Sequence, residues 1–317
     1  MATRRFPEPS YMFTLFDRGV RKRGCPQAYF NGNKIVDVCS RQGWEDDMPV
    51  RNPRQHDVWT AGDAYEPFVG RWSRRAAREF IAWLALAANS RWLDVGCGTG
   101  ALTQTILTTA APCEVLGVDP SEGFVAYARD HTQDSRAKFE VGNAQALPVA
   151  NSSFDVAVAG LVLNFVPDPV RATAEMRRAV RVGGTVAAYV WDYADGMQLL
   201  RRFWDAAVAL DPAARELDEG RRFPLCRREA LRSLLNDVGL ERTEVQAIDV
   251  PTVFKNFDDY WSPFLGRQGP APGYCMSLSD DRRARLRNHL QATLPVASDG
   301  TIHLKARAFA VRGVKPA

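Results

Sequence analysis

Three glycines and two aspartates carry the clearest chemistry in this 317-residue chain. Gly96, Gly98 and Gly100 follow a short apolar run, a pattern typical of a tight turn between a buried strand and a helix, where the backbone lies against a ligand. Asp119 ends a second apolar run about 20 residues later, where a carboxylate can accept hydrogen bonds from both hydroxyls of a ribose. Asp94 stands just before the turn and would repel a pyrophosphate, whereas a cationic amino acid suits it. The pattern predicts a nucleoside-containing ligand.

A regular series of strands and helices must position these residues. Apolar runs of strand length alternate with stretches of helical periodicity, and the predicted strands are 92–95, 113–119, 137–141, 154–159 and 185–191. A helix over 171–181, stopped by Gly183 and Gly184, precedes the last of these strands. Strand–helix alternation predicts parallel pairing with right-handed crossovers. We therefore expect an α/β fold with a doubly wound, mostly parallel, seven-stranded sheet.

After residue 191 the pattern loosens. Apolar periodicity predicts helices over 198–210 and 227–238 and one that ends at Leu294. Alternation predicts strands over 240–253 and 301–311, the second as an antiparallel edge strand at the C-terminus. The glycine- and proline-rich stretch 266–273 is predicted to be a loop. Two segments, 195–225 and 254–296, fall outside the sheet pattern and are predicted to cap it.

Composition restricts the class of protein. The chain is 46% hydrophobic and 25% charged, as is usual for a globular protein, and we expect neither a membrane span nor export. Ten basic and six acidic residues in 1–55 account for the net charge of +4, so no nucleic-acid surface is indicated. That segment is predicted to be a flexible basic extension, with the main domain at 56–317. The six cysteines show no metal-ligand spacing, which favours a reducing, cytoplasmic location and no metal.

Four motifs in order resemble the S-adenosylmethionine-dependent methyltransferases with the class I fold, over roughly residues 58–313. They are similar to the branch that includes ubiquinone and menaquinone biosynthesis C-methyltransferases. The motifs are the stretch from Leu93 to Gly100, the acid-ended strand up to Ser121, the turn 142–148, and the segment from Ser153 to Pro169.

The resemblance implies S-adenosylmethionine as the cofactor and a role for each matching residue. Asp94, Gly96, Cys97 and Gly98 would lie along its methionine part, and Asp119 would hold the ribose. The residues implied near the adenine are Pro120, Ser121, Asn143, Ala144 and Gln145. Leu161 would line the sulfonium side, and Tyr65 and Arg71 join the cofactor set. Asn143 departs from the family, which commonly has aspartate there, although an amide oxygen also accepts a hydrogen bond.

The acceptor is predicted to be a small apolar or aromatic molecule, since aromatic residues crowd the segments outside the sheet pattern. Trp72, Asn164, Phe165 and Trp191 are the candidate substrate residues. Tyr65, Trp72, Phe165 and Trp191 could also face the sulfonium charge. The family often has a histidine near Asn164, and this chain does not, so no catalytic base is assigned.

Two alternatives stay open from the sequence. Residues 96–101 formally satisfy the G-x-G-x-x-A pattern of nicotinamide-binding proteins, and Asp119 suits either cofactor. Asp94 and the motifs after residue 142 favour methyl transfer. A methyltransferase-like binding or regulatory protein without turnover is the second alternative, because no base is evident.

Overall fold

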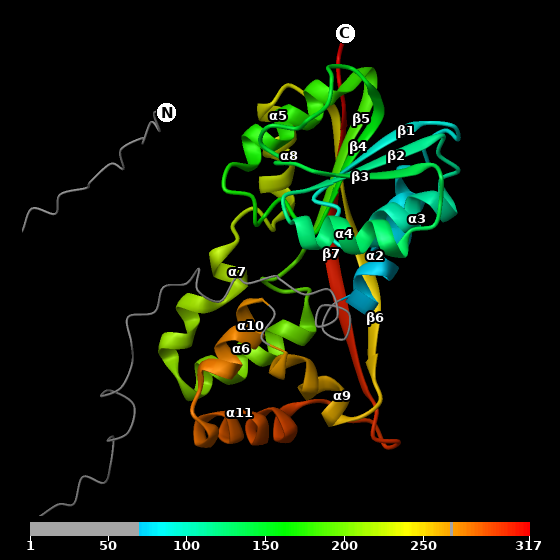
Figure 1. Ribbon diagram of the computed structural model, residues 1–317. Coiled ribbons are helices and arrows are strands. Elements are labelled where there is room, and N and C mark those ends of the chain that lie inside the picture. The colour runs from blue at the N-terminus through cyan, green and yellow to red at the C-terminus, as the bar shows by residue number, and fades with distance from the viewer. Residues whose placement is uncertain (1–69, 267–268) are drawn as a thin grey trace, which may run out of the picture. The chain divides into compact units, whose positions relative to one another are not determined.

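The computed structural model describes residues 70–266 and 269–317. Its centre is a seven-stranded sheet in the order β3-β2-β1-β4-β5-β7-β6 (Figure 1). The strands are β1 (Arg91–Val95), β2 (Glu114–Asp119), β3 (Ala137–Val141), β4 (Phe154–Gly160), β5 (Val180–Trp191), β6 (Glu241–Phe254) and β7 (Ile302–Val314). The first five strands pair in parallel, and β7 is antiparallel to both β5 and β6. The predicted doubly wound, mostly parallel sheet is confirmed.

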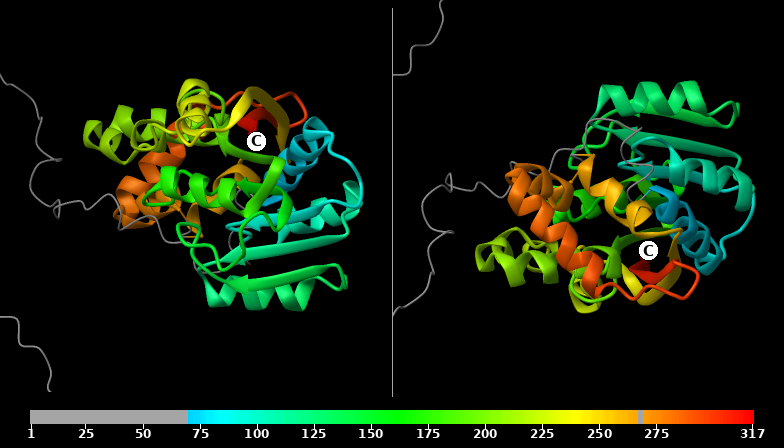
Figure 2. Two further views of the ribbon diagram at one scale, coloured as in Figure 1. Left: turned by 90° about the horizontal axis from the view of Figure 1, so that it is seen from above. Right: turned by 90° about the horizontal axis from the view of Figure 1, so that it is seen from below.

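Helices cover both faces of the sheet (Figure 2). The helices are α2 (Arg71–Leu84), α3 (Ala101–Thr109), α4 (Glu122–His131), α5 (Pro169–Ala179) and α8 (Arg228–Asp237). The order reverses between β1 and β4, so right-handed crossovers put α3 and α5 on opposite faces. α2 packs beside α3, and α8 packs beside α5. The reversal opens a crevice at the carboxyl ends of β1 and β4, where open α/β sheets bind ligands.

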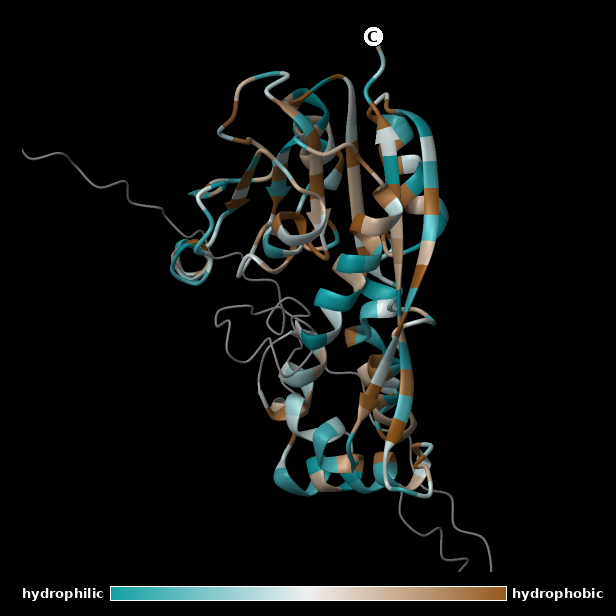
Figure 3. Cartoon of the chain, turned by 90° about the vertical axis from the view of Figure 1, so that its right-hand side faces the viewer, coloured by the Kyte–Doolittle hydropathy of each residue, from teal (hydrophilic) through white to brown (hydrophobic). Residues whose placement is uncertain are grey.

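A helical cap lies beyond the carboxyl ends of the strands (Figures 1 and 3). Its elements are α6 (Gln198–Leu210), η3 (Pro212–Leu217), α7 (Glu219–Arg222), α9 (Phe257–Trp261), η4 (Ser262–Leu265), α10 (Pro270–Ser277) and α11 (Asp280–Thr293). β5 ends at Trp191 opposite Ala308, so the earlier part of β7 pairs only with β6 and reaches the cap as a two-stranded ribbon. Hydrophobic and hydrophilic residues alternate along this ribbon, which buries one face against the helices (Figure 3).

Buried polar contacts hold the first cap segment together. Arg201 Nη2 on α6 pairs with Asp218 Oδ2 at 2.8 Å, and both side chains are largely buried. Trp204 Nε1 donates to Glu219 Oε2, and Glu219 is only 2% exposed. Burial raises the pKa of Glu219 to about 8. These contacts tie α6 to α7 from the inside.

Three sequence predictions need correction. The C-terminal strand is antiparallel as predicted, but it lies inside the sheet and β6 forms the edge, because alternation does not show how many neighbours a strand has. The predicted loop 266–273 contains the start of α10: Pro270 and Pro272 fit a first helical turn, which needs no N–H donors. The helix predicted to run to residue 181 ends at Ala179, because Val180 already pairs with Phe154.

Within the described residues, no helix is both long and apolar enough to cross a membrane.

Candidate active site

The turn between β1 and α3 follows a backbone path that favours glycine. Gly96 has φ of +73°, and a Cβ there would lie 2.6 Å from Val162 Cγ2. Gly98 has φ of +52°, with no atom within 4 Å of the place a Cβ would take. The Gly96 N–H donates to Val118 O at 2.7 Å, which holds the turn against the end of β2. The first glycine therefore serves packing, and Gly98 leaves the backbone open beside the crevice.

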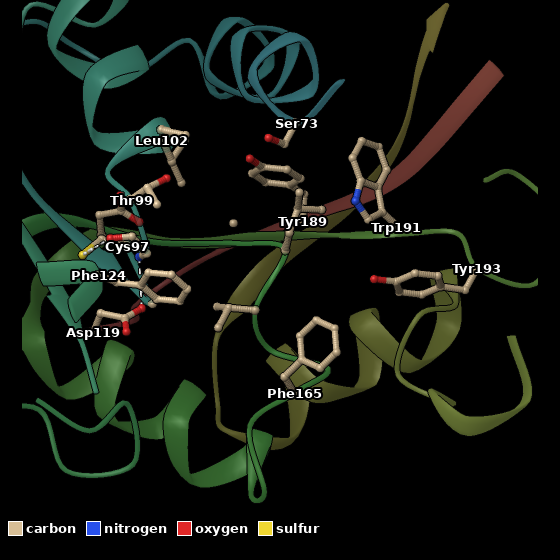
Figure 4. A pocket seen from close by; sticks show the side chains of 17 residues that line it. Ser73, Cys97, Thr99, Leu102, Asp119, Phe124, Phe165, Tyr189, Trp191 and Tyr193 are labelled. Atoms are coloured by element: carbon tan, nitrogen blue, oxygen red, sulfur yellow. Dashed lines mark hydrogen bonds between the residues drawn. The ribbon is translucent and has the colours of Figure 1, made fainter. Parts of the chain in front are cut away.

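Asp119, the last residue of β2, joins this turn to the next loop. Its Oδ2 accepts the Gly98 N–H at 3.0 Å (Figure 4), and its Oδ1 accepts the Ser121 N–H at 2.9 Å. Burial raises the pKa of Asp119, and the two N–H donors act against that rise. Each carboxylate oxygen has a second lone pair, so both can still accept a hydroxyl.

Asp94 on β1 is buried, and only one of its two carboxylate oxygens accepts a hydrogen bond from the described residues. The residue is 1% exposed, and its Oδ2 accepts from Thr103 Oγ1 at 2.7 Å. Within 70–266 and 269–317, its Oδ1 has no hydrogen-bond partner. Burial raises the pKa of Asp94 to about 7, and the charge of Asp119 adds to the rise. An unpartnered buried carboxylate oxygen is costly, and a cation or an N–H donor from a ligand would satisfy it.

A cavity of about 210 Å³ opens between these strand ends. It lies at the reversal of strand order, and β1, β2, β4, β5, α2, α3 and α4 with their loops contribute to its wall. Eight of the predicted site residues line it: Asp94, Gly96, Cys97, Gly98, Asp119, Leu161, Phe165 and Trp191. Burial raises the pKa of the Cys97 thiol, so it stays protonated and is no nucleophile at neutral pH.

The two ends of the cavity differ in chemistry (Figure 4). Asp119 and Phe124 lie at one end, close to the glycine turn, and Trp191, Tyr193 and Phe165 surround the other. Leu161 also lines the cavity, directly after β4. It has φ of +61°, a conformation that a branched side chain rarely adopts, and its N–H donates to Tyr189 O at 2.8 Å. A polar end for a nucleoside and an aromatic end for a second molecule lie in one cavity.

Residues 93–188, which include the glycine turn and the ends of β2 and β4, match the family model for the methyltransferase domain. This part of the chain is therefore similar to a methyltransferase domain. The 2-methyl-6-phytyl-1,4-hydroquinone methyltransferase of Synechocystis is 31% identical over 181 residues, which are 56% of this chain and 55% of the relative. The demethylmenaquinone methyltransferase of Symbiobacterium thermophilum is 34% identical over 121 residues, 37% of this chain and 48% of the relative. The chain thus spans about half the length of these curated relatives.

The chain also resembles a solved structure in fold. The phosphoethanolamine N-methyltransferase 2 of Haemonchus contortus, in complex with S-adenosyl-L-methionine, superposes with a TM-score of 0.50. The two are 18% identical, and the match covers 80% of this chain and 56% of that one.

Several predicted site residues of the methyltransferase domain do not line the cavity. Pro120, Ser121, Asn143, Ala144 and Gln145 lie in the loops after β2 and β3. Ser121 caps α4 by accepting the Phe124 N–H, and Asn143 Oδ1 accepts the Gln145 N–H at 2.9 Å. Asn164 lies after β4, and neither its amide oxygen nor its amide nitrogen has a partner in the part of the chain that the structure describes. Tyr65 lies outside the described residues.

Arg71 and Trp72 connect α2 to the cap rather than to the cavity. Arg71 Nη1 lies 3.0 Å from Asp259 Oδ1, and its guanidinium lies 4.5 Å from the Trp72 ring and 4.9 Å from the Phe254 ring. Trp72 is 3% exposed and meets Phe254 edge-on at 5.6 Å. Arg71 Nε and Nη2 have no hydrogen-bond partner among the residues that the structure describes.

Nine residues that sequence reasoning did not assign also line the cavity: Ser73, Thr99, Ala101, Leu102, Phe124, Gly160, Val162, Tyr189 and Tyr193. Phe124 had a usable signal, since it lies in the first turn of α4, soon after Asp119. Tyr189 and Tyr193 flank Trp191 at even spacing on and just after β5, so they could have been grouped with it. Among the residues described, no cluster of histidine, cysteine and acidic side chains is placed to hold a metal ion.

Proposed function

We propose that this protein transfers the methyl group of S-adenosylmethionine to a small, apolar or aromatic acceptor. The observation that carries the proposal is the pair of buried carboxylates on adjacent strand ends, Asp94 and Asp119, on one wall of the cavity. Asp94 Oδ1 lacks a partner, so the site suits a cationic amino group, and Asp119 offers two oxygens for neighbouring hydroxyls. An amino acid joined to a nucleoside combines these two features.

In this proposal each part of the cavity has a task. Asp94, oriented by Thr103, binds the ammonium group, and the bare backbone at Gly96 and Gly98 leaves room for the chain of the cofactor. Asp119 binds the ribose. The loops that contain Pro120, Ser121, Asn143, Ala144 and Gln145 border the adenine, with Phe124 against its face. Arg71 and Tyr65 stay in the proposed cofactor set, although Arg71 also binds Asp259.

The bound cofactor supplies a sulfonium methyl that is already activated. The residues then align the acceptor and exclude water, and alignment alone can provide much of a rate enhancement. Leu161 lines the same cavity, and Phe165, Trp191 and Tyr193 surround the acceptor end. No described side chain is assigned the role of a base.

We also propose that 195–225 and 254–296 act as the cap over the acceptor, with 1–55 as an extension of the domain. Cys97, Cys113, Cys226 and Cys275 are free, which supports a reducing, cytoplasmic location. The curated relatives named for hydroquinone and menaquinone methylation support a small-molecule acceptor.

Calorimetric titration of the full chain with S-adenosylmethionine, followed by mass spectrometry of reactions with a panel of quinols, phenols and amines, tests the proposal. We expect binding of one cofactor per chain and a mass gain of one methylene unit in at least one acceptor. Tight binding without turnover on every acceptor would favour a methyltransferase-like binding protein. Absence of binding, with a change in the fluorescence of reduced nicotinamide cofactors, would favour an oxidoreductase instead.

A further inference from the structure

Phe223 stands behind the aromatic end of the cavity and does not line it. The residue directly follows α7 and is only 9% exposed. Its ring meets the Phe165 ring edge-on, with 5.1 Å between the ring centroids, and lies 5.6 Å from the Tyr193 ring. Phe165 and Tyr193 both line the cavity and surround its acceptor end (Figure 4). One buried side chain therefore supports two walls of the acceptor end.

The segment that leads to Phe223 is fixed to the rest of the cap. Asp218, the N-cap of α7, accepts from Arg201 Nη2 at 2.8 Å and from Arg201 Nη1 at 2.9 Å through the same oxygen. Arg201 Nη1 also donates to Tyr193 O at 3.3 Å. The Phe223 N–H donates to Glu219 O at 3.0 Å. One largely buried guanidinium thus joins the backbone at Tyr193 to the short helix before Phe223, and such a network holds both in place.

We propose that Phe223 is a positioning residue that sets the size limit for the acceptor, because it holds Phe165 and Tyr193 against the space in which the acceptor lies. The inference rests on the proposed methyl transfer and adds the residue that limits the length of the acceptor. Protein interiors have few voids, so two walls that share one buried support have little room to yield. Selection then depends on a side chain that the acceptor does not touch.

Removal of this ring should lengthen the cavity. Truncation of a buried phenylalanine leaves a space that the surroundings fill only in part, and an apolar space of this kind can bind an apolar ligand. In Phe223→Ala the space would lie directly behind Phe165 and Tyr193, so either ring could move into it and open a path for a longer molecule. A purely structural role of Phe223 predicts weaker binding of every ligand, whereas the proposed role predicts a gain for the longer one.

The test compares benzamide with biphenyl-4-carboxamide, two neutral probes that differ by one phenyl ring. Calorimetry is carried out on the full chain saturated with S-adenosylhomocysteine. We expect the wild type to bind benzamide more tightly. In Phe223→Ala the ratio of the two affinities should shift by at least about tenfold toward the longer probe, which should bind more tightly than it binds the wild type. Affinity for S-adenosylhomocysteine should stay unchanged, because Phe223 lies outside the cavity wall.

Phe203→Ala is the matched control. Phe203 is a fully buried phenylalanine of the cap, and its ring contacts Trp204, Phe264 and Tyr274, none of which lines the cavity. This variant should keep the wild-type ratio of affinities. Phe223→Leu and Phe203→Leu form a milder pair for the case in which an alanine variant does not fold. Phe223→Leu should show a smaller shift in the same direction.

Arg201→Met separates position from space. The variant frees the segment before Phe223 while the ring of Phe223 remains, so benzamide should bind more weakly with no gain for the longer probe. A wild type that prefers the longer probe, an unchanged ratio in a folded Phe223 variant, an equal shift in its Phe203 counterpart, or absence of binding by both probes would overturn the inference. Failure of S-adenosylhomocysteine itself to bind the wild type would instead contradict the proposed function.

Discussion

The backbone N–H of Gly98 donates to Asp119 Oδ2 over 3.0 Å and so joins the turn after β1 to the end of β2. The turn leaves space for a ligand, and Asp119 would bind that ligand. The bond holds the two in a fixed relative position. A change at either residue is therefore felt at the other. The geometry of the site depends on this contact, and several predictions can be argued from it.

The two glycines of the turn should respond differently to alanine. In Gly96→Ala the new Cβ would meet Val162 at 2.6 Å, so the fold should lose about 2–4 kcal/mol of unfolding free energy from strain and overpacking. In Gly98→Ala the Cβ would enter open space, and only the backbone cost of about 1 kcal/mol applies. In Gly98→Ala the affinity for S-adenosylmethionine should fall by more than the small loss of unfolding free energy would explain. Urea unfolding and calorimetry on both variants check this, and a Gly98→Ala protein with unchanged affinity would contradict it.

Asp94 should make the ligand-free protein less stable as pH rises. Its pKa is about 7 in the folded protein because it is buried, against 3.8 for an aspartate free in water. The folded state therefore holds the proton more tightly, and this contribution is complete below about pH 4 and is lost as pH rises through 7. Asp94→Asn should remove up to ~4 kcal/mol of that pH dependence. Urea unfolding between pH 4 and 8 measures it, and parallel curves for the two proteins would rule the effect out.

Glu219, in the cap, should contribute a second loss of stability as pH rises. Burial raises its pKa from 4.5 to about 8, so its stabilising proton is present below about pH 4.5 and is lost as pH rises through 8. Glu219→Gln keeps an oxygen that can accept from Trp204 Nε1 and should flatten stability between these values. Tryptophan fluorescence during unfolding reports the change, with exposed Glu229→Gln as the control. Equal flattening in the control would remove Glu219 as the cause.

Much of the fold followed from local pattern. The glycine turn, the acid at the end of β2 and the helix over 198–210 all appear where periodicity and turn chemistry predict them. The interior position of β7 does not follow from its residues, because alternation reports which face is buried and not which strands pair. The helical start at Pro270 was missed, since prolines that fit a first turn also mark loops.

The site was predictable where it is continuous in sequence. Asp94, Gly96, Gly98 and Asp119 lie within one strand–turn–helix–strand unit, so spacing alone places them together. Tyr193 and Phe124 join the cavity only because the segment after β5 and the start of α4 line the same space, and no local pattern reports that. Arg71 was assigned to the cofactor, and its contact with Asp259 depends on a residue 188 positions away.

The Arg71–Asp259 pair should couple the first helix to the cap. Both side chains are partly exposed, at 31% and 26%, so we expect a coupling energy of roughly 0.5–1 kcal/mol from a double-mutant cycle with Arg71→Met and Asp259→Asn. Stacking on Trp72 and Phe254 should make Arg71→Met the more destabilising single change. If Asp259→Asn tightens S-adenosylmethionine binding, the freed guanidinium contacts the cofactor. A coupling energy near zero would show that the ion pair does not hold the cap.

The most direct measurement is the affinity of S-adenosylmethionine for the wild type and for Asp119→Ala, by calorimetry at constant pH. Loss of two charge-assisted hydrogen bonds should weaken binding by at least about 100-fold. Asp237→Ala, an exposed acid on α8, should bind as the wild type does. Circular dichroism confirms that each variant is folded. Unchanged affinity in a folded Asp119→Ala protein would contradict the assignment of this cavity to the methyl donor.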